Sequence, residues 1–394
     1  MRNTKYPTPR RQIRARTHQR LLVAAGLLAA LPAAQAVEMT AGDWKIDVGG
    51  YINAYYTSVS CGSEAVGGLA LAGRALGCGG ESSRTTIGNG LLPNALVTKF
   101  STEQDGYALG GTIGIMAHTA TDSAIDANSG VDVRQAFFTI SNGDIGTFKL
   151  GRDYGVFGSN AILSDMTLMG VGAPVQATQR GRVSLGHIGA GYTYLGNYGQ
   201  IAWTSPDMGG FSATVAVVSP VGNNGAYQSK SVPQVQGQLQ WNHDSFKAWV
   251  GAKTQRFYNR TNEDDTFTMR GFEAGASVTA GRFGGLVNVQ TGTGLGILAD
   301  GDQEDTRSTN WLAQGTFGLT DKVKLGANYG ISRNRDETLA TGGLKSNANA
   351  TVGVYWQITR SVTLALEGGR TTSKAFGGTT VDMDGGSVGG IIFF

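Results

Sequence analysis

Short stretches of alternating apolar and polar residues recur along the chain, joined by tight polar turns and by longer polar loops in alternation. In residues 107–118, for example, Leu109, Ile113 and Ile115 share one face of an extended strand, and Thr112 shares the other. Such alternation is typical of strands with one apolar face. Short turns that alternate with long loops are typical of barrels that cross a membrane, so the pattern predicts an all-β, antiparallel transmembrane β-barrel.

The hairpins carry strong turn signals, of which Asp105-Gly106 is the clearest. The sixteen predicted strands cover residues 51–56, 95–104, 107–118, 131–140, 145–151, 200–205, 211–218, 235–242, 246–255, 269–279, 285–291, 311–319, 323–332, 350–358, 362–371 and 387–394. A charge that faces lipid costs about 2–4 kcal/mol at the bilayer centre, so we expect Lys247 and Glu367 to point into a wet lumen. Aromatic residues near strand ends are expected either to form girdles at the membrane surfaces or to pack as ordinary strand residues: Trp44, Tyr55, Tyr56, Trp203, Trp241, Tyr329 and Trp356.

Residues 1–36 are expected to be a secretory signal peptide. They combine a basic start without acids, an apolar run at 21–31 that is too short for a bilayer, and the small-residue cleavage site Ala34-Gln35-Ala36. Arg10 and Arg11 leave twin-arginine export as an alternative to a long basic leader. Residues 37–394 are then a single barrel domain.

Removal of this leader leaves 25 basic and 29 acidic residues, a net charge near −4. The electrostatic basis for nucleic-acid binding is therefore missing. No run of 18 apolar residues follows the leader, so no helix is expected to span a bilayer. A membrane protein without such helices has to be a closed barrel, because lipid cannot satisfy open backbone groups.

Cys61 and Cys78 are the only cysteines, and an even number in an exported chain favours a disulfide. This disulfide would close a loop of about 18 residues and contribute about 3 kcal/mol. Two free thiols are the alternative, and no metal site is expected. The connections 57–87 and 152–182 are unusually long, and the second contains apolar residues that must pack against something.

The segment Arg134-Gln-Ala-Phe-Phe-Thr-Ile-Ser-Asn-Gly-Asp-Ile-Gly-Thr-Phe-Lys-Leu-Gly-Arg-Asp-Tyr-Gly155 resembles two consecutive strands of the general diffusion porins of Gram-negative bacteria. Residues 197–211 are similar to a later hairpin of that family. The terminal Phe394 resembles the assembly signal on the closing strand of outer-membrane barrels. The resemblance covers the layout of residues 37–394 and is motif-specific over about 131–218. It implies a homotrimer of sixteen-stranded barrels in the outer membrane, each narrowed by an inward-folded constriction loop at about 152–182.

The resemblance also implies contacts with outer-membrane lipid, lipopolysaccharide and the barrel-assembly machinery, and a pore constriction where wall arginines face loop carboxylates. Arg134 matches a wall arginine, and Asp165 matches a loop acid. Arg182 resembles a third family position, and Lys99 stands where the family often has another arginine. The remaining constriction candidates are Lys149, Arg152 and Arg180. Neutralising Asp165 is expected to favour anions, and neutralising Arg134 is expected to favour cations.

Signals for catalysis are weak. Residues 385–389 match G-x-S-x-G without the strand–turn–helix context that a nucleophile needs. His118, His187 and His243 lack metal-ligand spacing. Acid clusters at 263–265 and 300–305 are read as solvated loops, with bridging divalent cations as the alternative. We therefore expect no enzyme and no cofactor, but a porin for passive diffusion of ions and small hydrophilic solutes. The alternatives are a substrate-selective channel on the same barrel, an outer-membrane hydrolase and a secreted β-rich adhesin.

Overall fold

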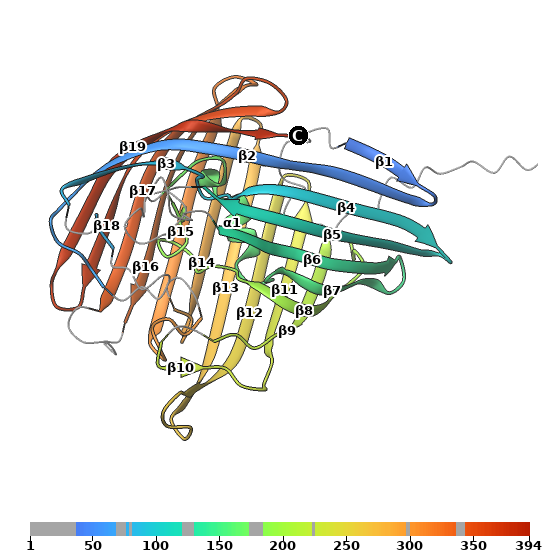
Figure 1. The fold of residues 1–394 in the computed structure, drawn as a ribbon, viewed down its shortest axis with the longest axis horizontal. Coiled ribbons are helices and arrows are strands. Elements are labelled where there is room, and N and C mark those ends of the chain that lie inside the picture. Colours follow the sequence, from blue (N-terminus) through green and yellow to red (C-terminus); the bar gives the residue numbers. More distant parts are fainter. Residues whose placement is uncertain are drawn as a thin grey trace, which may run out of the picture.

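The structure is a computed structural model, and it describes residues 37–67, 76–78, 81–119, 130–172, 184–222, 225–296, 300–335 and 343–394. Sixteen long antiparallel strands form a closed barrel (Figure 1), which confirms the predicted fold class. They are β2 (Trp44–Cys61), β4 (Asn94–Gln104), β5 (Tyr107–His118), β6 (Gly130–Asn142), β7 (Gly146–Tyr154), β8 (Asn197–Thr204), β9 (Phe211–Val218), β11 (Gln234–His243), β12 (Phe246–Asn259), β13 (Thr266–Ala280), β14 (Phe283–Thr293), β15 (Arg307–Gly318), β16 (Val323–Asn334), β17 (Leu344–Gln357), β18 (Val362–Ala375) and β19 (Thr380–Phe393). Three short strands complete the sheet: β1 (Val37–Ala41), β3 (Ser83–Gly88) and β10 (Tyr227–Gln228). Within the described residues, no helix has the length and apolar character needed to cross a membrane.

The barrel closes where the last strand meets the first. β2 pairs with β4 on one side and with β19 on the other. Gly50 and Phe394 exchange two backbone hydrogen bonds, of 2.9 and 3.0 Å, so the pairing reaches the carboxyl-terminal residue. The side chain of Phe394 lies on the exposed outer face together with Val388 and Ile392. This placement agrees with a closing strand; whether Phe394 is an assembly signal stays a prediction.

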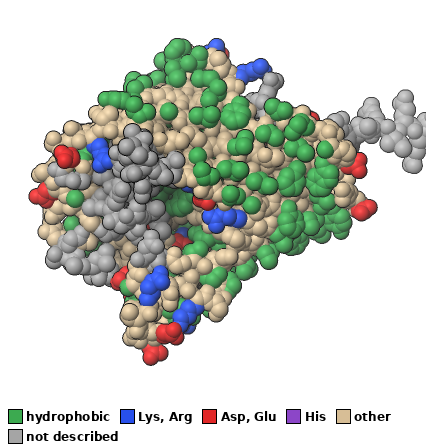
Figure 2. Space-filling view, viewed as in Figure 1, with side chains coloured by type: hydrophobic (Ala, Val, Ile, Leu, Met, Phe, Trp, Pro, Cys, Tyr) green, Lys and Arg blue, Asp and Glu red, His purple; other side chains and the backbone are tan. Residues whose placement is uncertain are grey.

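The outer wall is apolar and the inner wall is polar. Large exposed side chains such as Leu239, Val250 and Leu366 lie on the outer face, and Figure 2 shows apolar side chains over broad areas of the visible wall. Lys247 and Glu367 lie on the inner faces of β12 and β18, as predicted. This arrangement suits a barrel with lipid outside and a wet lumen inside.

One predicted girdle residue has a different role. Tyr55 is 2% exposed and donates a 2.7 Å hydrogen bond to the carbonyl of Met169 inside the barrel. Its neighbour Tyr56 is 48% exposed on the outer face, where Tyr329 and Trp356 also lie. Of the two alternatives left open for Tyr55, the girdle is wrong, because a strand that alternates at every residue places only one of two adjacent tyrosines outside.

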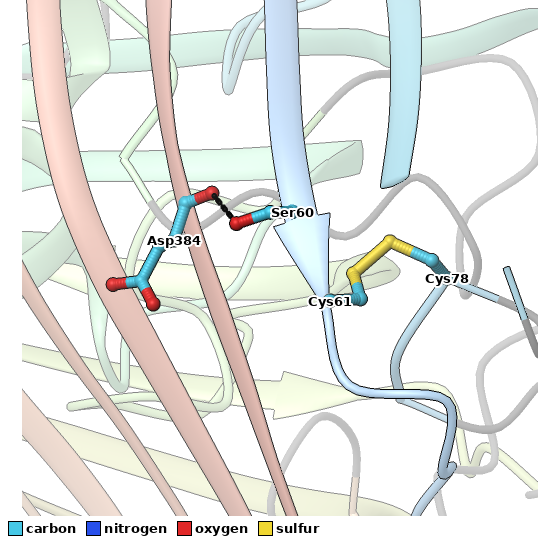
Figure 3. The surroundings of a disulfide bond; sticks show 4 residues. All are labelled: Ser60, Cys61, Cys78 and Asp384. Atoms are coloured by element: carbon cyan, nitrogen blue, oxygen red, sulfur yellow. Dashed lines mark hydrogen bonds between the residues drawn. A yellow bond between two sulfur atoms is a disulfide. The ribbon is translucent and has the colours of Figure 1, made fainter. Parts of the chain in front are cut away.

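Cys61 and Cys78 form a disulfide with a Cα–Cα distance of 5.9 Å (Figure 3), which confirms the predicted pairing. Cys61 is the last residue of β2, beside Ser60, whose hydroxyl donates to the carbonyl of Asp384 in β19. The disulfide therefore ties the connection after β2 to the end of a wall strand.

Replacing both cysteines by serine is expected to lower the free energy of unfolding by about 3 kcal/mol, because an 18-residue loop regains its freedom in the unfolded chain. The measurement is the urea midpoint of the folded protein with and without a thiol reductant. The reductant should lower the midpoint of the wild type and leave the midpoint of the double variant unchanged. An equal response of both proteins would contradict this role for the disulfide.

Candidate channel constriction

The connection between β7 and β8 folds into the barrel. After β7 the chain turns at Gly158, whose positive φ of 84° is the left-handed conformation that favours glycine. Two short helices follow, α1 (Ser159–Ser164) and η2 (Met166–Met169), and Figure 1 shows α1 within the ring of strands. The hydrogen bonds described below join this connection to strands on several sides of the lumen. They confirm the inward fold for residues 155–172 of the predicted loop 152–182; residues 152–154 belong to β7, and residues 184–196, beyond the predicted end, also lie inside the barrel. We call residues 155–172 and 184–196 the inward loop.

The first anchor of the inward loop lies on β11 and β13. The amide oxygen of Gln236 accepts hydrogen bonds from the backbone N–H groups of Val156 and Phe157, at 2.8 and 3.0 Å. The carboxylate of Glu273 accepts from the N–H of Gly158, with both oxygens at 3.0 Å. Wall side chains therefore satisfy backbone groups that water would otherwise have to satisfy.

A second anchor lies on β15 and β2. The side-chain amide of Gln314 accepts from the N–H of Met166 at 2.7 Å and donates to the carbonyl of Ser164 at 2.9 Å. Tyr55 of β2 donates to the carbonyl of Met169. The segment from the end of α1 to the end of η2, residues 164–169, thus runs from one wall of the lumen to another.

The third anchor is Glu367 of β18. One carboxylate oxygen accepts from the N–H groups of Val171 and Gly172, at 2.7 and 2.8 Å, and the other accepts from the hydroxyl of Tyr355 at 2.6 Å. A Cβ atom on Gly170 would lie 2.1 Å from this carboxylate, so a larger residue here would have to displace the carboxylate from its present position. The returning part of the loop is held by Asn347, which donates to the carbonyl of Gly189 at 2.9 Å.

Asp165 is at the centre of the inward loop, but its carboxylate has no exposed surface. It caps η2 by accepting from the N–H of Thr167 at 2.9 Å, and it accepts from the hydroxyl of Tyr192 at 2.7 Å. His187 Nδ1 lies 3.2 Å from the same carboxylate, and Asn328 of β16 donates at 3.4 Å. We predicted that Asp165 faces the pore. The structure instead places its carboxylate in a buried network, because four neighbours enclose it.

Arg134 lies on the inner face of β6, and its side chain is 8% exposed. One guanidinium nitrogen lies 2.6 Å from Nε2 of His118, and Nε lies 3.4 Å from the carboxylate of Asp132. The inner position agrees with a wall arginine. Its partners are side chains of the same wall, and no contact with Asp165 is found in the described part of the chain.

Lys149 and Lys99 also lie on the inner wall. Lys149 forms a 2.5 Å ion pair with Asp153, whose other oxygen accepts from Gln135. Lys99 is half-buried and lies opposite Asp47 in the β2–β4 register. No carboxylate lies within ion-pair distance of Lys99 in the described residues, so its ammonium group is a separate positive charge on the lumen wall.

The other basic candidates are placed differently. Arg152 shares the outward face of β7 with Leu150, and its guanidinium turns to the carbonyl of Val133 at 2.9 Å. The backbone of β7 points the side chain of Arg152 away from the lumen face that carries Lys149, because successive residues of a strand point to opposite sides. The guanidinium nevertheless reaches to 3.7 Å from the carboxylate of Asp132. Arg180 and Arg182 lie outside the described residues.

A cavity of about 500 Å³ lies beneath the inward loop, at the end of the barrel with the short turns. Lys324 of β16 and Lys322 in the turn before it line one side of the cavity, and Leu163, Met166 and Met169 of the inward loop line the other. Sequence reasoning did not single out these lysines. Their position next to a short turn can be read from the sequence, but nothing local in the sequence indicates that the inward loop approaches them from across the barrel.

The connection after β14 also folds inward, which the sequence did not predict. Asp300, read as part of a solvated acidic loop, is 6% exposed and forms an ion pair with Lys253 of β12. The ammonium group of Lys253 also lies 4.5 Å from the centre of the Phe157 ring in the inward loop. Lys253 therefore contacts two inward-folded segments. In the sequence, the only sign of this role is that strand alternation places Lys253 on the inner face of β12.

The motif at residues 385–389 lies within β19, without the turn and helix that a nucleophile requires. No group of three or more His, Cys, Asp or Glu residues is placed to hold a metal ion in the described ranges. His118 and His187 are partners of Arg134 and Asp165, and His243 ends β11.

The model of the Gram-negative porin family matches residues 21–375, and comparison with curated protein sequences finds no match. The fold is similar to the outer-membrane channel DcaP of Acinetobacter baumannii (TM-score 0.67, 14% identity, 92% of this chain and 100% of that chain covered). It is also similar to OmpF of Salmonella typhi in complex with daunomycin (0.62, 13%, 91% and 100%). A third similar structure is an anion-selective porin from Comamonas acidovorans (0.61, 14%, 89% and 100%). The chain therefore belongs to the Gram-negative porin family, and it is an outer-membrane β-barrel channel for passive diffusion.

Proposed function

We propose that the protein is a non-catalytic, homotrimeric pore that passes small hydrophilic solutes with a preference for anions. The observation that supports this preference is that several acids of the lumen are buried or paired, whereas some of its lysines are unpaired in the described part of the chain. Asp165, Glu273 and Glu367 accept hydrogen bonds from the inward loop or its neighbours and are 3–5% exposed. Each is thus removed from the water through which ions pass.

Three other acids of the inner wall lie near a cation. Asp153 is paired with Lys149, and Asp132 lies 3.4 Å from Arg134. Asp47 lies 3.6 Å from Lys45. A paired acid attracts a passing cation less than an isolated one, because the neighbouring positive charge cancels most of its field.

Several lysines of the inner wall, in contrast, have no acidic partner in the described ranges. They are Lys99, Lys247 and Lys324. Lumen charges of one sign select ions of the opposite sign in a narrow, low-dielectric pore. The fold shared with an anion-selective porin is consistent with this proposal. Family membership supports the trimer and the absence of catalysis.

The test is the reversal potential of purified trimers in a planar bilayer under a potassium chloride gradient. We expect the sign that marks chloride preference, and Lys324→Glu should move the potential toward that of a cation-preferring pore. The matched control is Lys374→Glu, which makes the same charge change at an exposed position on the outward face of β18. A cation-preferring wild type would refute the proposed ion preference.

A catalytic role is tested separately by assaying ester and lipid hydrolysis by the wild type and by alanine variants of His118, His187 and His243. Activity that disappears in one of these variants would favour the outer-membrane hydrolase. We expect no activity above that of a denatured control.

Dissociation of a heat-sensitive trimer band on SDS gels would support the proposed assembly.

A further inference from the structure

The cavity beneath the inward loop has two chemically different sides. The loop contributes Leu163 and two thioethers, those of Met166 and Met169. The wall contributes the ammonium groups of Lys322 and Lys324. Unbranched methionine side chains adapt to apolar ligands of varied shape, whereas lysine attracts an anion as a compact point charge.

The turn that carries Lys322 and the start of β16 that carries Lys324 are fixed in place. The hydroxyl of Thr320 accepts from the N–H groups of Lys322 and Val323, at 3.2 and 3.0 Å. The carbonyl of Lys322 accepts from the N–H of Gln357 on the neighbouring strand at 2.8 Å. The backbone under both ammonium groups is therefore positioned before a ligand arrives, which lowers the entropy cost of binding.

The loop side is fixed as well. Gln314 holds the backbone of Met166, and Tyr55 holds the backbone of Met169. Of the acids in the cavity lining, Asp165 is already enclosed by its own partners, and Asp321 shares the exposed turn with Lys322, so that Lys324 supplies the charge that no acid of the lining offsets. The net charge that a ligand meets in the inner part of the cavity is thus positive.

We propose that this cavity is a binding site for small carboxylates with an apolar body, which would bind with the carboxylate toward Lys322 and Lys324 and the body against the methionines. This inference rests on the proposed anion preference and deepens it, because it adds selection among anions. The cavity volume of about 500 Å³ is in the usual range of small-molecule sites. The site is reached from the short-turn end of the barrel, which is the periplasmic end in barrels of this kind.

The experiment measures the current through single trimers in potassium chloride while benzoate is added to the side of the short turns. Benzoate is expected to reduce the current in a saturable manner. Acetate, which has the charge without the ring, and benzyl alcohol, which has the ring without the charge, should each produce no saturable block. Benzoate added to the other side should act more weakly at equal concentration.

The variant Lys322→Gln with Lys324→Gln is expected to weaken the benzoate block about tenfold or more, since each lost charge-assisted contact is typically worth that much. Met169→Thr should weaken it by removing apolar contact. The matched control is Lys374→Gln, which makes the same charge change on the outward face of β18, outside the cavity lining, and should retain the block.

Two outcomes overturn the inference: benzoate that blocks no better than acetate, and a block that the double lysine variant leaves unchanged. The proposed function can fail independently. If the channel shows no chloride preference but its benzoate block still depends on the lysines, the binding site is supported and the proposed anion preference is refuted. If the channel prefers chloride but shows no saturable block, the proposed function is supported and the binding site is refuted.

Discussion

Asp165→Ala is expected to loosen the inward loop and to leave the ion preference of the channel nearly unchanged. The carboxylate is fully buried and accepts from the backbone of Thr167 and the hydroxyl of Tyr192, with His187 at 3.2 Å. Its removal leaves these donors without a partner and creates a void. Breaking a buried charged pair typically costs about 3–5 kcal/mol, so the loss of stability should be large.

The measurement combines the urea midpoint of unfolding with single-channel recordings, in which a loosened loop should produce a noisy, fluctuating current. The control is Asp132→Ala, which removes an inner-wall carboxylate that is 41% exposed. This control should cost far less stability and should move the reversal potential further toward anions. If Asp165→Ala shifted the reversal potential strongly and kept full stability, its carboxylate would have to face the pore after all.

The pH dependence of the loop follows from the same carboxylate. Burial raises the pKa of Asp165, but the charge and hydrogen bond of His187, together with Tyr192 and Thr167, outweigh burial and lower the pKa below its ordinary value. A pKa that is lower in the folded state stabilises the fold above the unfolded pKa, and this contribution is lost as the pH falls through the folded pKa. The stability difference between the wild type and Asp165→Ala should therefore shrink below about pH 4.

The strands could be predicted from the sequence because their signals are local. Alternation and turn residues predicted all sixteen, and the ends at the short turns agree within a few residues, except that β2 begins at Trp44 rather than at residue 51. Most of the opposite ends extend further than predicted, so that β12 continues to Asn259, whereas β5 and β9 end as predicted. Above the membrane a strand no longer needs an apolar face, and the alternation that marks it fades.

The partners of the inward loop could not be predicted. Asp165 is 163 residues from Asn328, and Glu367 is 196 residues from Val171. Alternation places Glu367 on the inner wall, but no local pattern states which backbone groups it will meet there. The same limit explains Asp300, whose acidic neighbours indicated a solvated loop although it forms an ion pair with Lys253 of β12.

Glu273→Ala combined with Glu367→Ala is expected to release the inward loop from two walls and to widen the pore. Glu273 holds Gly158 at the start of the loop, and Glu367 holds Val171 and Gly172 near its far end. Hydrogen bonds to a charged group contribute about 1.5–3 kcal/mol each. The double variant should therefore lose at least about 5 kcal/mol of loop attachment, more than either single variant.

The single-channel conductance is the primary measurement, and it should rise in the double variant together with the permeation rate of large neutral sugars. The proportion of folded trimer has to be checked by its resistance to SDS, so that conductance is compared between assembled pores. A double variant that assembles normally but keeps the wild-type conductance would show that the other anchors, Gln236, Gln314 and Tyr55, suffice to hold the loop.

Glutamine variants separate the effect of charge from the effect of hydrogen bonding. In Glu367→Gln the amide keeps one acceptor oxygen. This oxygen can accept the hydrogen bonds from the N–H groups of Val171 and Gly172, because a single oxygen of Glu367 accepts both in the wild type. In Glu273→Gln one of the two oxygens that accept from the N–H of Gly158 remains as an acceptor. We therefore expect the paired glutamine variant to keep a conductance close to that of the wild type. A glutamine pair as conductive as the alanine pair would mean that negative charge, rather than acceptor geometry, holds the loop across the lumen.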